Sequence, residues 1–256
     1  MTISNTPEFL TFCLILMRMA GFIFFNPILG KKGIPNSFKS GLAVVLTIVI
    51  YQIVEPQPVE VISSLSYGIL MIKELLVGFI IGFLMNLFEF VAVYAATIID
   101  YQMGLSMASV YDPTTGAQVA LTGNLFKTYF WLLFFAVDGH LALFKILIEA
   151  GAIIPYGSLV MGKEVSIAIL QIFIECVVLA VKLAIPIIIF EFLVEIGMGI
   201  LMRMIPQINL FVLSIQLRIV IGLIMLMVMS TVIGDYLNDV IIQMIQEIQD
   251  VLYLMG

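Results

Sequence analysis

The chain has 256 residues, of which 62% are hydrophobic and 11% are charged, and its formal net charge is -6. Ordinary soluble domains carry about 25% charged residues, so this composition excludes a soluble globule as well as a disordered or disulfide-rich secreted chain. The composition leaves two classes open: an integral membrane protein, or a chain buried in a larger hydrophobic assembly.

The apolar residues form long stretches that predict helices and no strand-type alternation. The stretches cover residues 9–29, 40–54, 68–99, 126–148, 165–202 and 208–234, with a last helix over residues 235–254. The longest charge-free run, residues 219–234, is sixteen residues, whereas a membrane-crossing helix needs about 20 apolar residues. Charged residues therefore lie inside the helices of an all-α integral membrane protein, a single domain over residues 1–256.

The loop after the first stretch carries three lysines, and the next loop carries no cation. By the positive-inside rule, the first loop is cytoplasmic, and six crossings follow if every stretch crosses the membrane. The amino terminus lacks the basic segment of a cleavable signal peptide, so insertion is expected to use retained helices.

The third stretch is 32 residues, about 48 Å of helix, which is too long for one simple crossing. At 100° per residue its charged and small residues share one stripe: Glu74, Gly78, Gly82, Glu89 and Asp100. Glycines four residues apart allow close helix packing, and carboxylates facing lipid are costly. The stripe is expected to face protein as a packing seam; a proton or ion relay is the alternative.

The fifth stretch is polar on two sides. Glu175 and Lys182 lie on one side, Glu191 and Glu195 on the other, and Pro186 predicts a kink. The two glutamates repel each other unless a cation is close, and the candidates are Arg18, Arg203 and Arg218. We expect other helices to surround this one.

The tail over residues 235–256 is an amphipathic helix without Lys or Arg. It is poorly suited to an anionic membrane surface, so docking on a partner protein is preferred, and folding back on its own chain is the alternative.

Residues 102–116 form the most informative connection, an apolar loop closed by an Asp-Pro turn. Flexible Met side chains fill irregular gaps, so the loop fits a compliant plug, with a plain re-entrant connection as the alternative. The residues assigned to this plug are Gln102, Met103, Gly104, Met107, Val110, Tyr111, Asp112, Pro113 and Gly116.

Two other polar segments are predicted to be structural. Asp138-Gly139-His140 indicates a helix interruption or cap, and the segment through Arg203, Pro206, Gln207 and Asn209 indicates a hairpin tip that contacts other subunits. The two cysteines have no paired spacing, His140 is the only histidine, and basic runs are lacking. No metal site, cofactor, catalytic site or nucleic-acid partner is therefore expected.

The order and spacing of several motifs resemble one family over nearly the whole chain. They are Arg18, Pro27-Ile28-Leu29-Gly30, Pro35, Lys39, Gly41-Leu42-Ala43, Glu74, Gly78, Gly82, Ile99-Asp100-Tyr101-Gln102-Met103-Gly104, Asp112-Pro113, Gly116, Asp138-Gly139-His140, Ala184, Pro186, Gly199, Arg203, Pro206-Gln207, Asn209 and Phe211. The chain resembles the R-type subunit of the bacterial flagellar export gate, the FliR family, and its type III secretion counterpart, SctT. It departs at Gln216, where the family often has a proline.

The resemblance implies a multi-pass inner-membrane protein of the flagellar basal body, built of long, kinked helical hairpins. It implies one copy assembled with P-type and Q-type subunits around a pore for unfolded flagellar proteins, with residues 102–116 as the plug. The assembly contacts would include the seam residues, Glu191, Glu195 and Arg203. The alternatives are an injectisome gate subunit, a secondary transporter using the carboxylate stripe, and an intramembrane enzyme using Asp100, Asp112 or Asp138 with His140.

Overall fold

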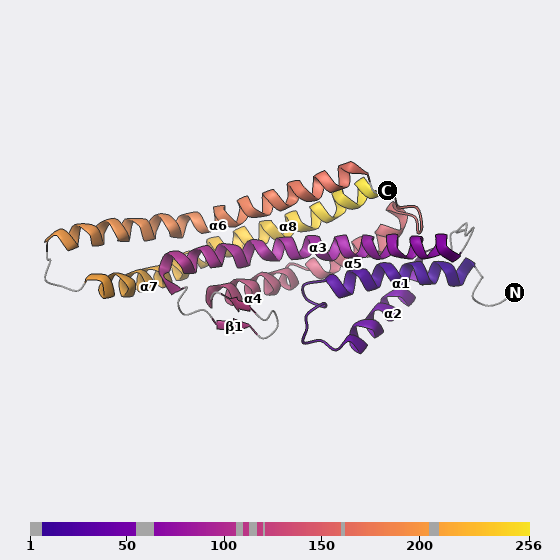
Figure 1. The fold of residues 1–256 in the computed structure, drawn as a ribbon, viewed down its shortest axis with the longest axis horizontal. Helices are drawn as coiled ribbons and strands as arrows, with labels where there is room; N and C mark the ends of the chain where they lie inside the picture. The colour runs from indigo at the N-terminus through magenta and orange to yellow at the C-terminus, as the bar shows by residue number, and fades with distance from the viewer. Residues whose placement is uncertain are drawn as a thin grey trace. The chain divides into compact units, whose positions relative to one another are not determined.

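The computed structural model describes residues 7–54, 64–105, 110–112, 117–119, 121–159, 162–204 and 210–256, which fold almost entirely into helices (Figure 1). The elements are α1 (Pro7–Phe25), α2 (Asn36–Ile53), α3 (Ser64–Met103), β1 (Val110–Asp112), β2 (Ala117–Val119), α4 (Leu121–Ala136), α5 (Gly139–Ile153), α6 (Lys163–Met204), α7 (Leu210–Val228) and α8 (Ser230–Met255). The predicted all-α membrane architecture is confirmed.

Among the residues that the structure describes, four helices are long and apolar enough to cross a membrane: α1, α2, α3 and α6. Two further pairs qualify only if each is counted as one bent span: α4 with α5, bent by 70°, and α7 with α8, bent by 63°. The first bend follows from Asp138, whose φ of 59° is left-handed and ends the helical path before Gly139. The predicted interruption at Asp138-Gly139-His140 is confirmed.

The predicted boundary between the last two helices is wrong. The sequence placed it after Gly234, but α7 ends at Val228 and α8 begins at Ser230. Gly234 lies inside α8, where a Cβ atom would collide with the hydroxyl of Tyr129 on α4. This glycine serves close packing and does not end a helix.

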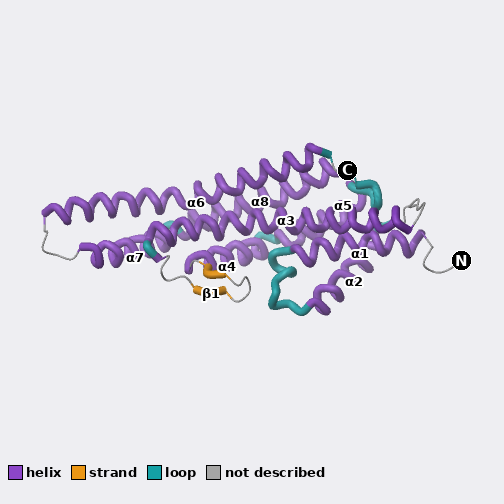
Figure 2. The backbone as a smooth tube through the Cα atoms, in the orientation of Figure 1, coloured by secondary structure: helices purple, strands orange, loops and turns teal. Residues whose placement is uncertain are grey.

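A short hairpin lies where the sequence predicted a loop without strands (Figure 2). β1 and β2 pair antiparallel in the register Val110 with Val119, Tyr111 with Gln118, and Asp112 with Ala117. Strands of three residues are too short to produce a recognisable alternation of polar and apolar residues. The hairpin does not change the fold class.

The chain packs as two compact units rather than around one centre. Unit 1 contains Met1–Leu87, Asp138–Phe173 and Ile242–Gly256, and unit 2 contains Phe88–Val137 and Ile174–Ile241. The divisions fall inside α3, α6 and α8 and at the bend before Asp138.

In unit 1, α1 packs directly against the backbone of α3. A Cβ atom on Gly78 would overlap the carbonyl oxygen of Arg18, and one on Gly82 would lie 2.8 Å from the carbonyl of Phe25. Gly21 makes the reciprocal close approach to the carbonyl of Leu75. These three glycines bring the two helix backbones into contact, as small residues do in membrane bundles.

In unit 2, the second part of α3 is buried along a face of small residues. Val91, Ala92, Ala95, Ala96 and Ile99 have no exposed surface. The Tyr236 hydroxyl of α8 donates a hydrogen bond to the carbonyl of Leu179 on α6, at 2.9 Å. Small buried residues on α3 allow its neighbours to approach closely.

The apolar face of α8 packs within the chain, so the preferred prediction that it docks on a partner is wrong. Its fully or nearly fully buried residues are Leu237, Val240, Ile241, Met244, Ile248, Val251, Leu252 and Met255. In unit 1, the backbone of Gly256 lies against the carbonyl of Ile153 at the end of α5. The amphipathic pattern correctly identified the face to be buried but did not determine what buries it.

Candidate functional site

Arg18, on α1, is completely buried and makes three hydrogen bonds. Its Nε donates to Glu74 Oε2 on α3 at 2.6 Å, Nη1 to the carbonyl of Ala150 at 3.0 Å, and Nη2 to the carbonyl of Ile154 at 3.1 Å. Both carbonyls lie at the carboxyl end of α5, where the helix dipole favours a cation, and the Ala150 carbonyl also accepts the amide of Ile154 at 2.9 Å. Arg18 thus joins three helices.

The second oxygen of Glu74 holds the turn that follows α5. Glu74 Oε1 accepts a hydrogen bond from the amide of Gly157 at 2.8 Å, and Gly157 has a φ of 89° that favours glycine. The ring of Tyr156 lies 4.3 Å below the Arg18 guanidinium. Burial raises the pKa of the Tyr156 hydroxyl. The cluster is a neutralised structural clamp within unit 1.

Glu89 forms a second cluster, in unit 2. Its Oε1 pairs with Lys127 Nζ at 2.6 Å, and its Oε2 accepts a hydrogen bond from Trp131 Nε1 at 3.1 Å. Lys127 and Trp131 are four residues apart on α4 and reach α3 from one face. Their spacing is a signal in the sequence that could have identified this partner pair.

Asp100 caps the amino end of α4. Its Oδ2 accepts a hydrogen bond from the amide of Thr122 at 3.1 Å, and its Oδ1 accepts one from the Thr122 hydroxyl at 2.5 Å. Thr122 is the second residue of α4, so the carboxylate lies at the positive end of the helix dipole. Asp100 supplies a cap from another helix, a role that chain order did not predict.

The segment assigned as a plug is preceded by the end of α3 and followed by the start of α4, which Asp100 of α3 contacts through Thr122. Gly104 follows α3 with a φ of 79°, and its amide donates to the carbonyl of Tyr101 at 3.2 Å. Met103 is buried, and Gln102 is half-buried. Asp100 fixes the returning end through Thr122. Val110, Tyr111 and Asp112 form β1, whereas Met107, Pro113 and Gly116 lie outside the described residues.

The cation beside the paired glutamates of α6 is Arg218. Its Nη2 lies 2.8 Å from Glu195 Oε1, whereas Arg18 is used by the clamp in unit 1. Glu191 is 1% exposed, and its carboxylate oxygens make no hydrogen bond to the described residues. A Cβ atom on Gly222 would lie 2.8 Å from Glu191 Oε1, so the α7 backbone runs directly past this carboxylate.

The three carboxylates of the predicted seam do not form one cluster, and of the predicted hairpin tip the structure describes Arg203. Arg203 is exposed in the last turn of α6, and Pro206, Gln207 and Asn209 lie outside the described residues. Glu74, Glu89 and Asp100 each have a different fixed partner. The part of the chain that the structure describes contains no group of three or more His, Cys, Asp or Glu side chains that could hold a metal ion.

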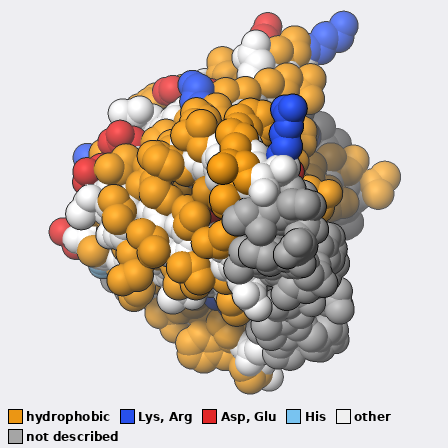
Figure 3. Space-filling view, turned by 90° about the vertical axis from the view of Figure 1, so that its left-hand side faces the viewer, with side chains coloured by type: hydrophobic (Ala, Val, Ile, Leu, Met, Phe, Trp, Pro, Cys, Tyr) orange, Lys and Arg blue, Asp and Glu red, His pale blue; other side chains and the backbone are white. Residues whose placement is uncertain are grey.

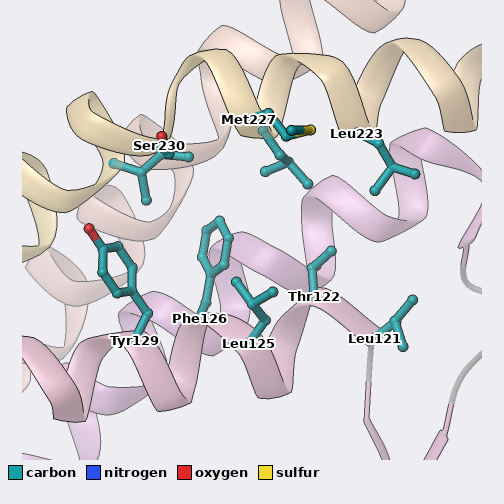
Figure 4. Close-up of a pocket in the computed structure, with 10 residues that line it drawn as sticks. Leu121, Thr122, Leu125, Phe126, Tyr129, Leu223, Met227 and Ser230 are labelled. Carbon is teal, nitrogen blue, oxygen red and sulfur yellow. The ribbon is translucent and has the colours of Figure 1, made fainter.

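An apolar pocket of about 450 Å³ opens in unit 2 (Figure 4). Leu121, Leu125, Phe126 and Tyr129 line it from α4, Leu223 and Met227 from α7, and Ser230 from the first residue of α8. Its lining is almost entirely hydrocarbon, with hydroxyl groups at the margin, as expected for a cavity beside lipid or another apolar helix.

Comparison with known proteins covers almost the whole chain. Residues 9–244 match the family described as bacterial export proteins, family 1. The chain belongs to this family.

Curated relatives of this export protein match at nearly full length. It is 29% identical to the flagellar biosynthetic protein FliR of Bacillus subtilis, over 97% of this chain and 96% of the relative. It is 27% identical to FliR of Escherichia coli, over 93% and 90% of the two chains. It is 28% identical to the Yop proteins translocation protein T of Yersinia pestis, over 86% and 85%.

Hydrophobic side chains cover much of the described part of the face that Figure 3 shows. The exposed hydrophobic residues of α6 alone include Ile167, Leu170, Phe173, Ile174, Val178, Ile185, Ile189, Phe190, Phe192, Leu193, Ile196, Ile200 and Met204. A 39-residue segment of α6 is long and apolar enough to cross a membrane, although most of its residues are not buried within the chain. Lipid or other protein must cover this surface.

Proposed function

We propose that this chain is a subunit of the flagellar type III protein export gate, a multi-pass protein of the bacterial inner membrane. The observation that carries the proposal is the family match over residues 9–244. The full-length similarity to FliR of Bacillus subtilis, at 97% of this chain, supports the flagellar system. The gate provides the pore through which unfolded flagellar proteins leave the cell.

We infer that the chain works with P-type and Q-type gate subunits and the other membrane components of the export apparatus. The resemblance of the sequence to the R-type subunit suggests these partners. The large exposed apolar surface of α6 supports assembly, because its exposed face also carries Glu175 and Lys182, which are poorly tolerated by lipid.

We infer further that residues 102–116 plug the pore before export begins. Two anchors support this role. Gly104 ends α3 in a left-handed conformation, and Asp100 holds Thr122 where the chain re-enters a helix. The two anchors hold the helix ends on either side of this segment in fixed positions.

The role we assign is structural rather than catalytic, and it does not involve ion carriage. Glu74 is neutralised by Arg18, and Glu89 by Lys127. Asp100 is held at a helix terminus. A relay needs carboxylates that exchange protons with their neighbours, whereas these three are each held by a separate fixed partner.

Deletion of the gene and complementation test the proposal. We expect the deletion strain to lack flagella and to secrete no flagellar proteins, and the wild-type gene to restore both. Flagella that assemble normally in the deletion strain would overturn the flagellar assignment. Loss of effector secretion in that strain would instead support an injectisome role, as named for the Yersinia relative.

A further inference from the structure

Within unit 2, the wide exposed surface of helix α6 includes a stripe that carries two charges. At 100° per residue, seven exposed side chains fall within about 60° of one another. We name this set the α6 stripe: Glu175, Val178, Lys182, Ile189, Leu193, Ile196 and Ile200. Glu191 and Ala184 lie on the opposite face, where they are buried.

The α6 stripe combines two charges with an apolar strip. Leu193 is 57% exposed and Ile200 is 58% exposed. Glu175 and Lys182 are also exposed, and neither makes an ion pair with another residue that the structure describes. They are about 10.5 Å apart along the helix axis, too far for their charged groups to neutralise each other directly.

Lipid is a poor occupant for this surface. From Glu175 to Ile200 the stripe is about 38 Å long, whereas the hydrocarbon core is about 30 Å thick. Both charges lie within an apolar segment that qualifies as a membrane span. Charged side chains in such segments normally face protein or water and pair with an opposite charge.

A second copy of this chain is also a poor occupant. Copies inserted in one membrane share one orientation, so a two-fold axis would run along the membrane normal and pair α6 with α6 in parallel. That arrangement would place Glu175 against Glu175 and Lys182 against Lys182, and like charges at an interface are repulsive. A different chain can supply the opposite charges.

We propose that the α6 stripe docks a transmembrane helix of another export-gate subunit, one with a Lys or Arg opposite Glu175 and an Asp or Glu opposite Lys182. The partner's apolar residues pack on the strip from Ile189 to Ile200. This inference rests on the proposed function, because it requires the chain to assemble with other gate subunits. Charge complementarity sets the register of the partner helix, and the apolar strip supplies most of the contact area.

Charge reversal tests the stripe. The full-length tagged chain is co-expressed with the other membrane components of the export apparatus and purified in mild detergent. Glu175→Lys or Lys182→Glu should lower the amount of co-purified subunits at least about tenfold, because each change places like charges together. Thermal unfolding of the isolated variants should be unchanged. The matched control is Asp239→Lys, an exposed carboxylate on α8.

The double variant E175K/K182E separates a partner's charges from pairing within the chain. Because the partner's charges stay fixed, the double variant should recover no more complex than either single variant. Reversing the facing charges of the partner as well should restore recovery. Full recovery by the double variant alone would overturn the proposal, since it would indicate that the two side chains need only each other.

Photo-cross-linking identifies the occupant. A photoreactive residue at Leu193 should cross-link to a different gate subunit of the purified complex, through a helix with the expected charge pair. The same residue at Tyr253, which is 66% exposed on α8, gives the background. Cross-links from Leu193 to lipid alone, or to a second copy of this chain, would overturn the proposal.

The outcomes also separate this inference from the proposed function. If the wild-type chain purifies without any other export component, both the proposed function and the proposed docking on the α6 stripe are wrong. If the wild-type complex forms and the two single reversals assemble as well as Asp239→Lys, only the stripe is wrong.

Discussion

At the residue scale, the interior of this export protein depends on buried charges whose partners are fixed. Arg18 and Glu74 are both without exposed side-chain surface and are joined at 2.6 Å. Each also bonds to backbone groups of α5 or of the turn after it. A buried pair of this kind is costly to form, so its effect is seen most clearly when one partner is removed.

Removing only one member of this pair should be strongly destabilising. Arg18→Leu leaves Glu74 buried without its cation and removes the side-chain hydrogen bonds to the carbonyls of Ala150 and Ile154, so we expect a loss of about 3–5 kcal/mol of unfolding free energy. Thermal and denaturant unfolding of the purified protein in detergent measure it. The double variant R18L/E74L should lose less than the sum of the two single changes; strict additivity would show that the pair does not act as a unit.

Loss of the Asp100 cap should loosen the start of α4. Asp100→Ala removes the acceptor for the Thr122 amide, and we expect a loss of about 1–2 kcal/mol together with faster hydrogen exchange in the first turn of α4. Asp239→Ala, on the exposed face of α8, is the control. Unchanged exchange at Thr122 would contradict the capping role.

At the element scale, close contact between backbones determines how α1 and α3 pack. Gly78 and Gly68 lie on the same helix but have different surroundings. A Cβ atom on Gly78 would collide with the backbone of α1, and one on Gly68 would meet no atom within 4 Å. The two positions therefore provide a matched comparison within one helix.

Gly78→Ala should destabilise the protein by at least about 1–3 kcal/mol, because α1 must move away from α3 to admit the methyl group. Gly68→Ala should be neutral or slightly stabilising, since alanine is the better helix former. Unfolding in detergent compares the two variants. Equal effects would show that the close approach at Gly78 contributes nothing to stability.

The loop after α3 should control leakage through the resting gate. Replacing residues 106–111 with a Gly-Ser linker retains Gly104 and the Asp100 cap, so assembly should continue. If this segment plugs the pore as proposed, the linker removes the apolar side chains of the plug, and we expect ion conductance across planar bilayers to rise. Conductance equal to that of the wild-type complex would argue against the plug.

At the scale of the whole molecule, the exposed surface indicates a subunit rather than a complete machine. Mild detergent extraction followed by mass measurement should give a stable assembly of this chain with other hydrophobic subunits. Assembly with other subunits removes the apolar helix surface from water and gives the exposed charges on the helices opposite charges to pair with. A lone 28.4 kDa species with transport activity would contradict this expectation.

Much of the fold could be predicted because the signals for a helix lie in residues that are close together in the sequence. The long apolar stretches gave the helices, and Asp138-Gly139 gave the bend between α4 and α5. The predicted boundary at Gly234 was wrong because the sequence does not distinguish a glycine that ends a helix from one that allows another side chain to pack closely against the helix. Only the nearby Tyr129 hydroxyl distinguishes the two uses.

By itself, the sequence determined the composition of the interior: an all-helical membrane chain, charges within its helices, and a seam of carboxylates and glycines along α3. Helical periodicity is a local property, so these features can be derived from residue spacing alone. The partners of the charges were decided by tertiary structure. Arg18 and Glu74 are separated by 56 residues, and Asp100 and Thr122 by 22 residues. Such pairings depend on which helices pack against each other, and the spacing of residues along the sequence does not determine that.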